Sequence, residues 1–214
     1  MRTLPERVGL RIQRAVWPES LATLGLPRAG DFPAPSAFAA FGDGSWLVPP
    51  VSVTGAGHIA IGTGVVVMEH AEIRAEPAAD APVPNGPLVQ IGDGTRLARF
   101  ATVWATVGIH IGAGVSSSDY IALLDCWGAP RHQEGSAPPP PAAPIVVEDG
   151  AYLGCRCVIG PGVRVGSGAF VGEGAVVLDD VPAHAVVYGN PARVTRQWTP
   201  EAGWQGDMFA RAAT

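Results

Sequence analysis

The stretch VEDGAYLGCRCVIGPGVRVGSGAFVGEGAVVLDD, residues 147–180, carries an aliphatic residue at every sixth position. These residues are Val147, Leu153, Ile159, Val165, Val171 and Val177. The residue four places after each of them is small: Ala151, Cys157, Val163, Ala169, Ala175 and Val181. A helix would repeat its apolar positions near every 3.6 residues and a half-buried strand near every two. Glycine directly follows four of the six aliphatic residues, which would also destabilise a helix.

A repeat of six residues is typical of a parallel β-helix. Each hexad forms one short strand and one turn, with the aliphatic side chain pointing inward onto its counterpart in the next coil. The small residue also faces the narrow interior. Three hexads close one triangular coil, and successive coils stack about 4.8 Å apart. The quoted stretch therefore predicts about two coils of an all-β protein.

The same period appears upstream in three further groups of residues. They are Ile61, Val67 and Ile73; then Ile91, Leu97 and Val103; then Ile111, Ser117 and Leu123. The third group is two residues out of step, which predicts a bulge at residues 108–110. Residues 74–87, rich in Pro and Ala, predict an excursion or long turn. Residues 127–144 contain four consecutive prolines, which cannot continue a β ladder, so they predict a protruding loop.

These patterns divide the chain into three parts. Residues 1–40 are expected to form an N-terminal arm, with a short amphipathic helix or arm over 5–16. Residues 41–197 are expected to form the β-helix domain, from which loop 127–144 is extruded. Residues 198–214 are expected to form a C-terminal tail.

Composition narrows the possible classes of function. Charged residues make up 15% of the chain, the net charge is −5, and no block rich in Lys or Arg occurs, which argues against a nucleic-acid partner. No apolar run approaches the ~20 residues needed to span a membrane, and the charged N-terminus is unlike a signal peptide. The three cysteines, an odd number, argue against a disulfide framework and suit a reducing cytoplasm.

The hexads together with the chain's ending carry a family resemblance. The segments IGPGVRVGSGAFVGEGAVVLDDVPAHAVVYGNPARVTR (159–196) and VQIGDGTRLARFATVWATVGIHIGAGVSSSDYIALLDC (89–126) resemble the hexapeptide-repeat acyltransferases. The closest resemblance is to the group that acts on polysaccharide or lipopolysaccharide sugars. The D-V-P…G-N-P-A-R ending is more specific than the repeat itself. The resemblance implies a left-handed parallel β-helix.

The resemblance also implies a reaction. An acyl group, expected to be acetyl, passes from acetyl-CoA or another acyl-CoA to a hydroxyl of a sugar or glycan precursor. A histidine acts as general base, and backbone N–H groups or polar side chains hold the oxyanion. Such enzymes are homotrimers with each active site between two β-helices, and they need no metal.

The family's histidine usually lies in a motif of the type D-H-x-H before the protruding loop. Here Asp125 matches, Cys126 occupies the histidine's place and Gly128 the second one. Three interpretations remain open. Another histidine, His132 on the loop or His110, reaches the site; Cys126 itself accepts the acyl group; or the enzyme has lost activity and kept its shape.

The resemblance also assigns residues to the cofactor and the acceptor. Cys155 falls where a small residue normally touches CoA, and Arg193 and Arg196 match a basic pair that meets the nucleotide's phosphates. Where the family commonly has Thr-Lys before Asp, this chain has Leu178 and Asp179, which weakens the expected affinity for CoA. Trp104, Tyr120 and Trp127 are candidates to line a sugar-binding cleft.

Other functions compete with acyl transfer. The main alternative is a catalytically inactive β-helix that serves as a binding or assembly subunit. A γ-class carbonic anhydrase needs three converging histidines on Zn²⁺, and the five histidines here, residues 58, 70, 110, 132 and 184, lack that spacing. A nucleotidyltransferase is disfavoured because no nucleotide-binding βαβ unit precedes the repeats.

Overall fold

The computed structural model describes residues 33–77, 86–127 and 142–207. The expected N-terminal helix over 5–16, most of loop 127–144 and His132 lie outside these ranges. The described chain is almost entirely β-strand and turn, with two short 3₁₀ segments, η2 (Pro35–Ala37) and η3 (Ala56–His58). The prediction of an all-β fold is therefore confirmed.

Most strands are two to four residues long and belong to three sheets. Sheet A contains β1 (Ala40–Phe41), β4 (Ile59–Ile61), β7 (Val89–Ile91), β10 (Ile109–Ile111), β13 (Ile145–Val147) and β16 (Arg164–Val165). Sheet B contains β2 (Trp46–Leu47), β5 (Val66–Val67), β8 (Arg96–Leu97), β11 (Ser116–Ser117), β14 (Tyr152–Leu153), β17 (Phe170–Val171), β19 (Ala185–Gly189), β20 (Ala192–Thr199) and β21 (Gly203–Gly206). Sheet C contains β3 (Ser52–Thr54), β6 (Glu72–Ala75), β9 (Thr102–Ala105), β12 (Ala122–Leu124), β15 (Val158–Ile159) and β18 (Val176–Val177).

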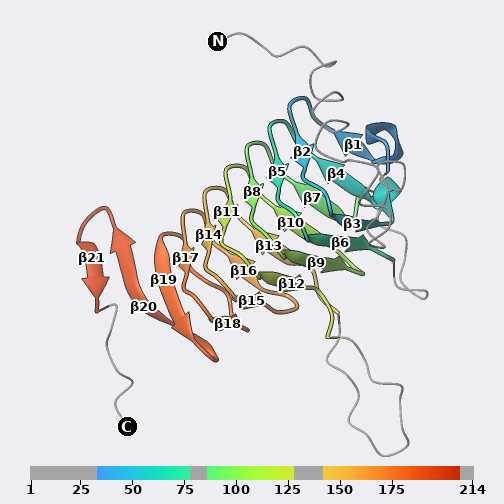
Figure 1. Cartoon of the computed structure of the whole chain (residues 1–214). Coiled ribbons are helices and arrows are strands. Elements are labelled where there is room, and N and C mark those ends of the chain that lie inside the picture. Colours follow the sequence, from blue (N-terminus) through green and yellow to red (C-terminus); the bar gives the residue numbers. More distant parts are fainter. Residues whose placement is uncertain (1–32, 78–85, 128–141, 208–214) are drawn as a thin grey trace, which may run out of the picture.

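The chain visits sheets A, B and C in turn, so three consecutive strands make one coil. Coil 1 is β1–β2–β3 and coil 6 is β16–β17–β18, and every strand pairs in parallel with its counterpart in the next coil. Figure 1 shows the coils stacked side by side along one axis, with the three sheets as the faces of a prism. This arrangement is the predicted parallel β-helix.

The core is the inside of the prism. The six aliphatic residues of the quoted stretch are at most 1% exposed, and the six small residues between them are at most 4% exposed. Burying one such aliphatic side chain contributes about 1.5–3 kcal/mol. Ser117 is the exception among the predicted inward positions, because it is half-buried and its hydroxyl accepts a hydrogen bond from the N–H of Ala98 at 3.0 Å.

The two extra residues between Val103 and Ile111, before coil 4, do not form the predicted bulge in a strand. The sequence predicts a bulge at 108–110, yet Ile109, His110 and Ile111 pair in unbroken register with both neighbouring strands. The extra residues lie in the corner at 106–108, outside the ladder. A corner can lengthen without disturbing the pairing of the strands on either side of it.

The end of the chain leaves the parallel pattern. Strand β19 continues sheet B in parallel with β17, and β20 and β21 then add to it as antiparallel strands. In Figure 1 this segment extends sheet B beyond the last coil. The antiparallel strands run across residue 197, where the sequence places the end of the β-helix domain.

Candidate functional site

The three edges of the prism differ in how regular they are. From sheet A to B (the A–B edge) and from B to C (the B–C edge), inward residues are six apart in all six coils, as from Val147 to Leu153 to Ile159. From sheet C to A (the C–A edge) the spacings are eight, 18, eight, 24 and six residues. All extra length therefore lies at the C–A edge, and loops on a rigid scaffold are where binding and catalytic residues concentrate.

Asp125 organises the C–A edge at coil 4. Its side chain is 0% exposed. Its carboxylate accepts hydrogen bonds from the N–H groups of Thr106, Val107 and Gly108, at 2.7–2.9 Å. The Thr106 hydroxyl donates another at 2.9 Å. The carboxylate thus holds the lengthened corner of coil 3 against coil 4.

Asp125 also lies where the longest connection of the C–A edge, from β12 to β13, leaves the prism and returns to it. The N–H of Ala143 donates to the carbonyl of Asp125 at 2.9 Å, and the N–H of Gly162 donates to the carbonyl of Ala143 at 3.0 Å. The N–H of Ile145 donates to the carbonyl of Gly108 at 3.0 Å. The chain therefore leaves the prism after Asp125 and returns beside it.

Cys126 and Trp127 follow directly at this edge, and both are half-buried. A Cβ on Gly160 would lie 2.9 Å from Cζ2 of Trp127 and 3.2 Å from Cδ2 of Leu178. The indole of Trp127 therefore lies on bare backbone at Gly160, and only glycine leaves room for it. The sequence singled out Cys126 and Trp127 but offered no sign that Gly160 supports them.

The described histidines do not gather at Cys126. His110 lies in the middle of β10 on the exposed side of sheet A, between Gln90 and Val146. His58 lies in η3 at the C–A edge of coil 1. Of the two histidines proposed as bases, His132 is outside the described residues and His110 lies two residues beyond the corner that Asp125 holds.

The cysteines lie in three environments. Cys155 is half-buried in the corner between β14 and β15, at the B–C edge. Cys126 lies at the C–A edge, so the two residues flank opposite sides of sheet C. Cys157 is 0% exposed, and burial raises the pKa of its thiol to about 12. This matches the prediction that Cys157, as one of the small residues of the hexads, faces the interior.

Sheet C presents an apolar outer face between Cys126 and Cys155. The outward residues of its last three coils are Ala122, Leu124, Val158 and Val176, all half-buried, and Leu178 beyond them is 48% exposed. In the earlier coils the outward positions are more polar, and the guanidinium of Arg74 lies 4.7 Å from the ring centre of Trp104. Trp104 and Trp127 thus belong to sheet C and its C–A edge.

The two arginines assigned to the cofactor lie on β20. Arg193 is exposed and pairs with Asp179 at 3.1 Å. Its charge is therefore partly neutralised by the residue that stands where the family has lysine. Arg196 is half-buried, with its guanidinium 4.9 Å from the ring centre of Trp204. Within one chain, the five predicted site residues that the structure describes, Asp125, Cys126, Cys155, Arg193 and Arg196, lie on different edges and strands.

The B–C edge carries a column of stacked rings that the sequence did not reveal. The ring centres of His70 and Phe100 are 4.8 Å apart, and those of Phe100 and Tyr120 are 4.5 Å apart, with nearly parallel planes. The guanidinium of Arg156 lies 5.6 Å from the Tyr120 ring. These four residues have φ between 58° and 63°. Such a backbone costs non-glycine residues roughly 1 kcal/mol or more, which ring stacking partly offsets.

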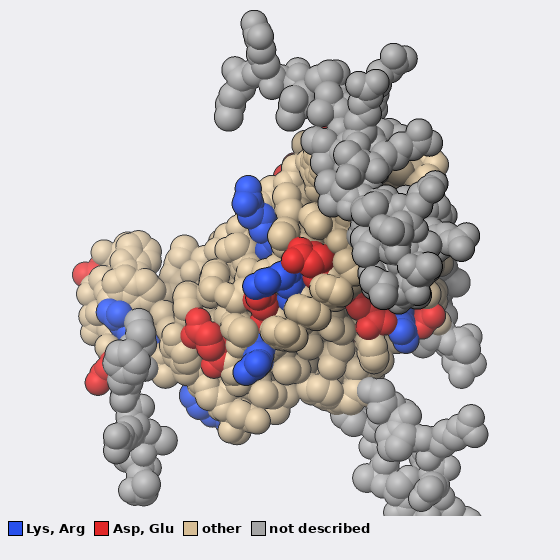
Figure 2. Space-filling model, viewed as in Figure 1, with Lys and Arg blue, Asp and Glu red and all other residues tan. Residues whose placement is uncertain are grey.

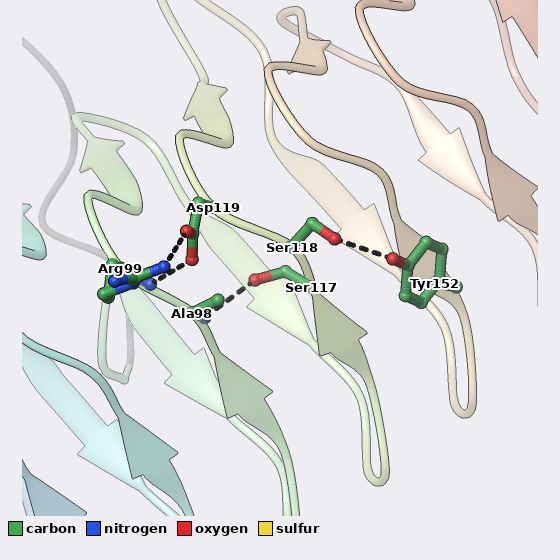
Figure 3. Close-up of polar contacts among 6 residues, drawn as sticks. All are labelled: Ala98, Arg99, Ser117, Ser118, Asp119 and Tyr152. Atoms are coloured by element: carbon green, nitrogen blue, oxygen red, sulfur yellow. Dashed lines mark hydrogen bonds and ion pairs between the residues drawn. The ribbon is translucent and has the colours of Figure 1, made fainter.

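Polar contacts run alongside this column (Figure 3). Arg99 and Asp119 form an ion pair at 2.7 Å, and the hydroxyls of Ser118 and Tyr152 are hydrogen-bonded at 2.7 Å. The hydrogen bond from Arg99 lowers the pKa of the Asp119 carboxyl. Tyr120 therefore belongs to the B–C edge and is separated by sheet C from Trp127.

The surface shows no sign of a charged binding patch on the face in view. Figure 2 shows Arg side chains interspersed with Asp and Glu on a largely uncharged surface. Within residues 33–77, 86–127 and 142–207, no group of three or more His, Cys, Asp or Glu residues is placed to hold a metal ion. In the same ranges, no helix has the length and hydrophobicity to span a bilayer.

Comparisons with known proteins agree with this architecture. Residues 144–179 match the family model of the bacterial transferase hexapeptide repeat. A 2,3,4,5-tetrahydropyridine-2,6-dicarboxylate N-acetyltransferase of Staphylococcus aureus is 44% identical over 89 residues, 42% of this chain and 30% of the relative. The chain thus spans less than a third of the length of the curated relatives it matches.

Two groups of solved structures are also similar. AntD, an N-acyltransferase from Bacillus cereus in complex with dTDP and 3-hydroxybutyryl-CoA, superposes with a TM-score of 0.62 at 17% identity, covering 74% of this chain and 82% of AntD. The hexapeptide-repeat acetyltransferase VCA0836 from Vibrio cholerae gives 0.51 at 22% identity, covering 89% and 86%. At these identities the similarity concerns the fold. The chain therefore carries the bacterial transferase hexapeptide repeat over residues 144–179, and its three-sheet prism has the fold of a left-handed β-helix.

Proposed function

We propose that this protein is an acyltransferase that moves an acyl group, acetyl in the first instance, from acyl-CoA to a hydroxyl of a sugar or glycan precursor. The observation that carries the proposal is the C–A edge. There Asp125 fixes the start and the return of the longest connection, directly beside Cys126 and Trp127. The family match and the acyl-CoA-using relatives supply the reaction class.

The transfer needs a base and a place for the developing charge. The base takes the proton of the acceptor hydroxyl as its oxygen attacks the thioester carbonyl. The carbon–sulfur bond then breaks, the acyl group stays on the acceptor, and the proton passes to the leaving CoA thiolate. We assign the base to His132 and the binding of the acceptor to the C–A edge beside Cys126.

Asp125 serves this reaction as a positioning residue. Its carboxylate is fully buried and already accepts hydrogen bonds from four donors. No lone pair of this carboxylate is therefore left for the sugar that receives the acyl group. It holds the backbone from which Cys126 and the loop emerge. Loss of this carboxylate is expected to lower kcat while leaving the binding of acyl-CoA largely intact.

The acyl-CoA is expected to lie between two copies of the chain in a homotrimer. Cys126, at the C–A edge, and Cys155, at the B–C edge, flank opposite sides of the apolar outer face of sheet C. A second copy packed against that face would bring the C–A edge of one chain toward the B–C edge of the other. Such a site can combine Cys126 of one chain with Cys155, Arg193 and Arg196 of the next. A mass of three chains in solution, measured by light scattering, is the expected result.

The acceptor atom is tested by comparing two sets of compounds. Acetyl-CoA is incubated with nucleotide sugars that carry only hydroxyls and with nucleotide sugars that carry a free amine, and release of the CoA thiol is followed. Turnover with hydroxyl acceptors is expected. Turnover restricted to the amines would instead make the protein an N-acyltransferase, the activity named for the relatives above.

Paired variants identify the base. His132→Ala is expected to abolish turnover, and His110→Ala, on the exposed side of sheet A, is the matched control that should retain it. Cys126→His places the family's residue in its usual position and is expected to support turnover even when combined with His132→Ala.

A second candidate function is an inactive binding or assembly subunit. Cys126 in the histidine's place and Asp179 in the lysine's place favour it. Absence of turnover with both acceptor sets, together with no measurable binding of acetyl-CoA by calorimetry, would establish this alternative.

A further inference from the structure

A pocket of about 280 Å³ opens at the A–B edge, near the C-terminal end of the prism. It is lined by Gly168, His184, Trp198 and Trp204. Gly168 lies in the corner between β16 and β17, and His184 lies in the corresponding corner one coil later. The pocket is therefore on a different edge from both Cys126 and Cys155.

The walls of the pocket are held in place. Trp198 and Trp204 are directly opposite each other on the antiparallel strands β20 and β21, so their side chains share one face of that hairpin. The ring of His184 stands at 77° to the ring of Trp198, with 5.6 Å between centres, and the N–H of Trp198 donates to the carbonyl of His184 at 3.2 Å.

The floor of the pocket depends on a glycine. Gly168 has φ of +60°, and a Cβ there would lie 2.6 Å from Nδ1 of His184. Both indoles remain well exposed, Trp198 at 37% and Trp204 at 49%. The cavity is thus kept open by the absence of a side chain at 168, with large aromatic surfaces left facing solvent.

One polar group borders these rings. Arg196 shares the face of Trp198 on β20, and its guanidinium lies 4.9 Å from the ring centre of Trp204. Among the described residues its buried Nε has no hydrogen-bond partner. No carboxylate lines the pocket. The pocket lining therefore offers aromatic faces and one imidazole, and the guanidinium of Arg196 lies beside it against the Trp204 ring.

We propose that this pocket binds one pyranose ring of a glycan, at a site separate from acyl transfer. Its volume lies just below the range of pockets that enclose drug-sized ligands, so it suits a single ring. The perpendicular walls suit a saturated ring, whose C–H groups contact an aromatic face while its hydroxyls reach polar groups at the side. A nucleobase sandwiched between two rings would need them parallel to its plane, and Trp198 and His184 stand at 77° to each other.

Such a site would hold a polymeric acceptor while the C–A edge acts on one of its residues. The proposal concerns binding alone, so it is tested without turnover. The full-length protein is titrated with maltotriose, cellotriose and chitotriose, and binding is followed by calorimetry and by tryptophan fluorescence. Binding of at least one trisaccharide is expected.

Variants locate the binding. Trp204→Ala and Trp198→Ala are each expected to raise the dissociation constant at least tenfold, and Gly168→Ala, which narrows the pocket, is expected to raise it as well. Trp46→Ala is the matched control, because Trp46 is exposed to the same degree, 38%, but lies on sheet B in coil 1. It should bind as the wild type does.

Several outcomes would overturn the proposal. These are the lack of binding to all three trisaccharides, equal loss in Trp46→Ala, or displacement of the sugar by UDP or dTDP. A change of oligomeric mass in Trp204→Ala with unchanged sugar affinity would show that a second copy covers the rings instead. Failure of acyl transfer would not affect the result, since the trisaccharides are measured by binding.

Discussion

The A–B edge and the C–A edge of the prism begin from the same six-residue geometry and diverge in length. Corners of the A–B edge span the same number of residues in every coil, whereas those of the C–A edge vary between coils by up to 18 residues. The strands on both sides of each corner keep their register. Length can therefore vary at one edge while the stacked core stays regular.

Both edges use an aspartate to close a corner, but on different scales. At the A–B edge, Oδ1 of Asp149 accepts one hydrogen bond from the N–H of Ala113 at 2.8 Å, and Asp149 is exposed. At the C–A edge, Asp125 accepts from three N–H groups and a hydroxyl and is fully buried. A longer corner has more backbone donors without strand partners, and the buried carboxylate supplies their acceptor.

The largest expected effect is a difference in thiol reactivity between the core cysteine and the two cysteines at the edges. With a pKa of about 12, Cys157 should react with iodoacetamide at pH 8 about a thousandfold more slowly than an ordinary exposed thiol, because the thiolate is the reacting form. Mass spectrometry of the native protein should show labelling at Cys126 and Cys155 and none at Cys157. In denaturant all three should react. Labelling of native Cys157 would contradict its place in the core.

The next effect measures the regular core itself. Ile159→Ala in coil 5 should lower the free energy of unfolding by about 2–5 kcal/mol, because it leaves a cavity among residues that are fully buried. Val158→Ala, one residue earlier on the half-buried outer face, should cost clearly less. Chemical denaturation measures both, and equal losses would argue against the inward orientation of residue 159.

The two aspartates test the comparison of edges directly. Asp125→Ala leaves four donors without an acceptor and should lower the free energy of unfolding by about 3 kcal/mol. Asp149→Ala removes a single exposed hydrogen bond and should cost about 1 kcal/mol or less. If the two variants were equally stable, the C–A corner would not depend on its carboxylate.

The smallest effect is expected at the B–C edge. The hydrogen bond from Arg99 lowers the pKa of Asp119 in the folded state, so this pair stabilises the protein above the carboxyl's unfolded pKa. The stabilisation is lost as the pH falls through the lower folded pKa. Asp119→Asn should therefore be slightly less stable than the wild type at pH 7 and indistinguishable in acid. A difference that grew on acidification would contradict this assignment.

The regular parts of the fold were predictable from the sequence because their information is local. Each hexad places an aliphatic residue and a small residue inside, so Val147 to Val177 reveal two coils without knowledge of any contact. Cys157 could be assigned to the core for the same reason. The structure of the corner of coil 3 could not be predicted in this way, because Asp125, which accepts the hydrogen bonds of its N–H groups, lies 17–19 residues later.

The candidate site was only partly predictable for a related physical reason. Asp125, Cys126 and Trp127 were singled out because they stand where the resembling family has its D-H-x-H motif, and the structure places them at the edge where corners lengthen. The rings of His70, Phe100 and Tyr120 stack although they are 30 and 20 residues apart in sequence. Insertions of different length between coils hide such columns from any fixed period. The pocket of Trp198 and Trp204 escaped detection because its hairpin lies outside the hexads.

The confinement of extra chain to a single edge has a consequence for engineering. A segment that leaves and rejoins the scaffold beside one buried carboxylate can be exchanged for another of different length or composition, with coils above and below unaffected, because each coil contacts only its neighbours. Grafting the connection after Asp125 from one such protein into another would test the proposed role of this edge in acceptor choice.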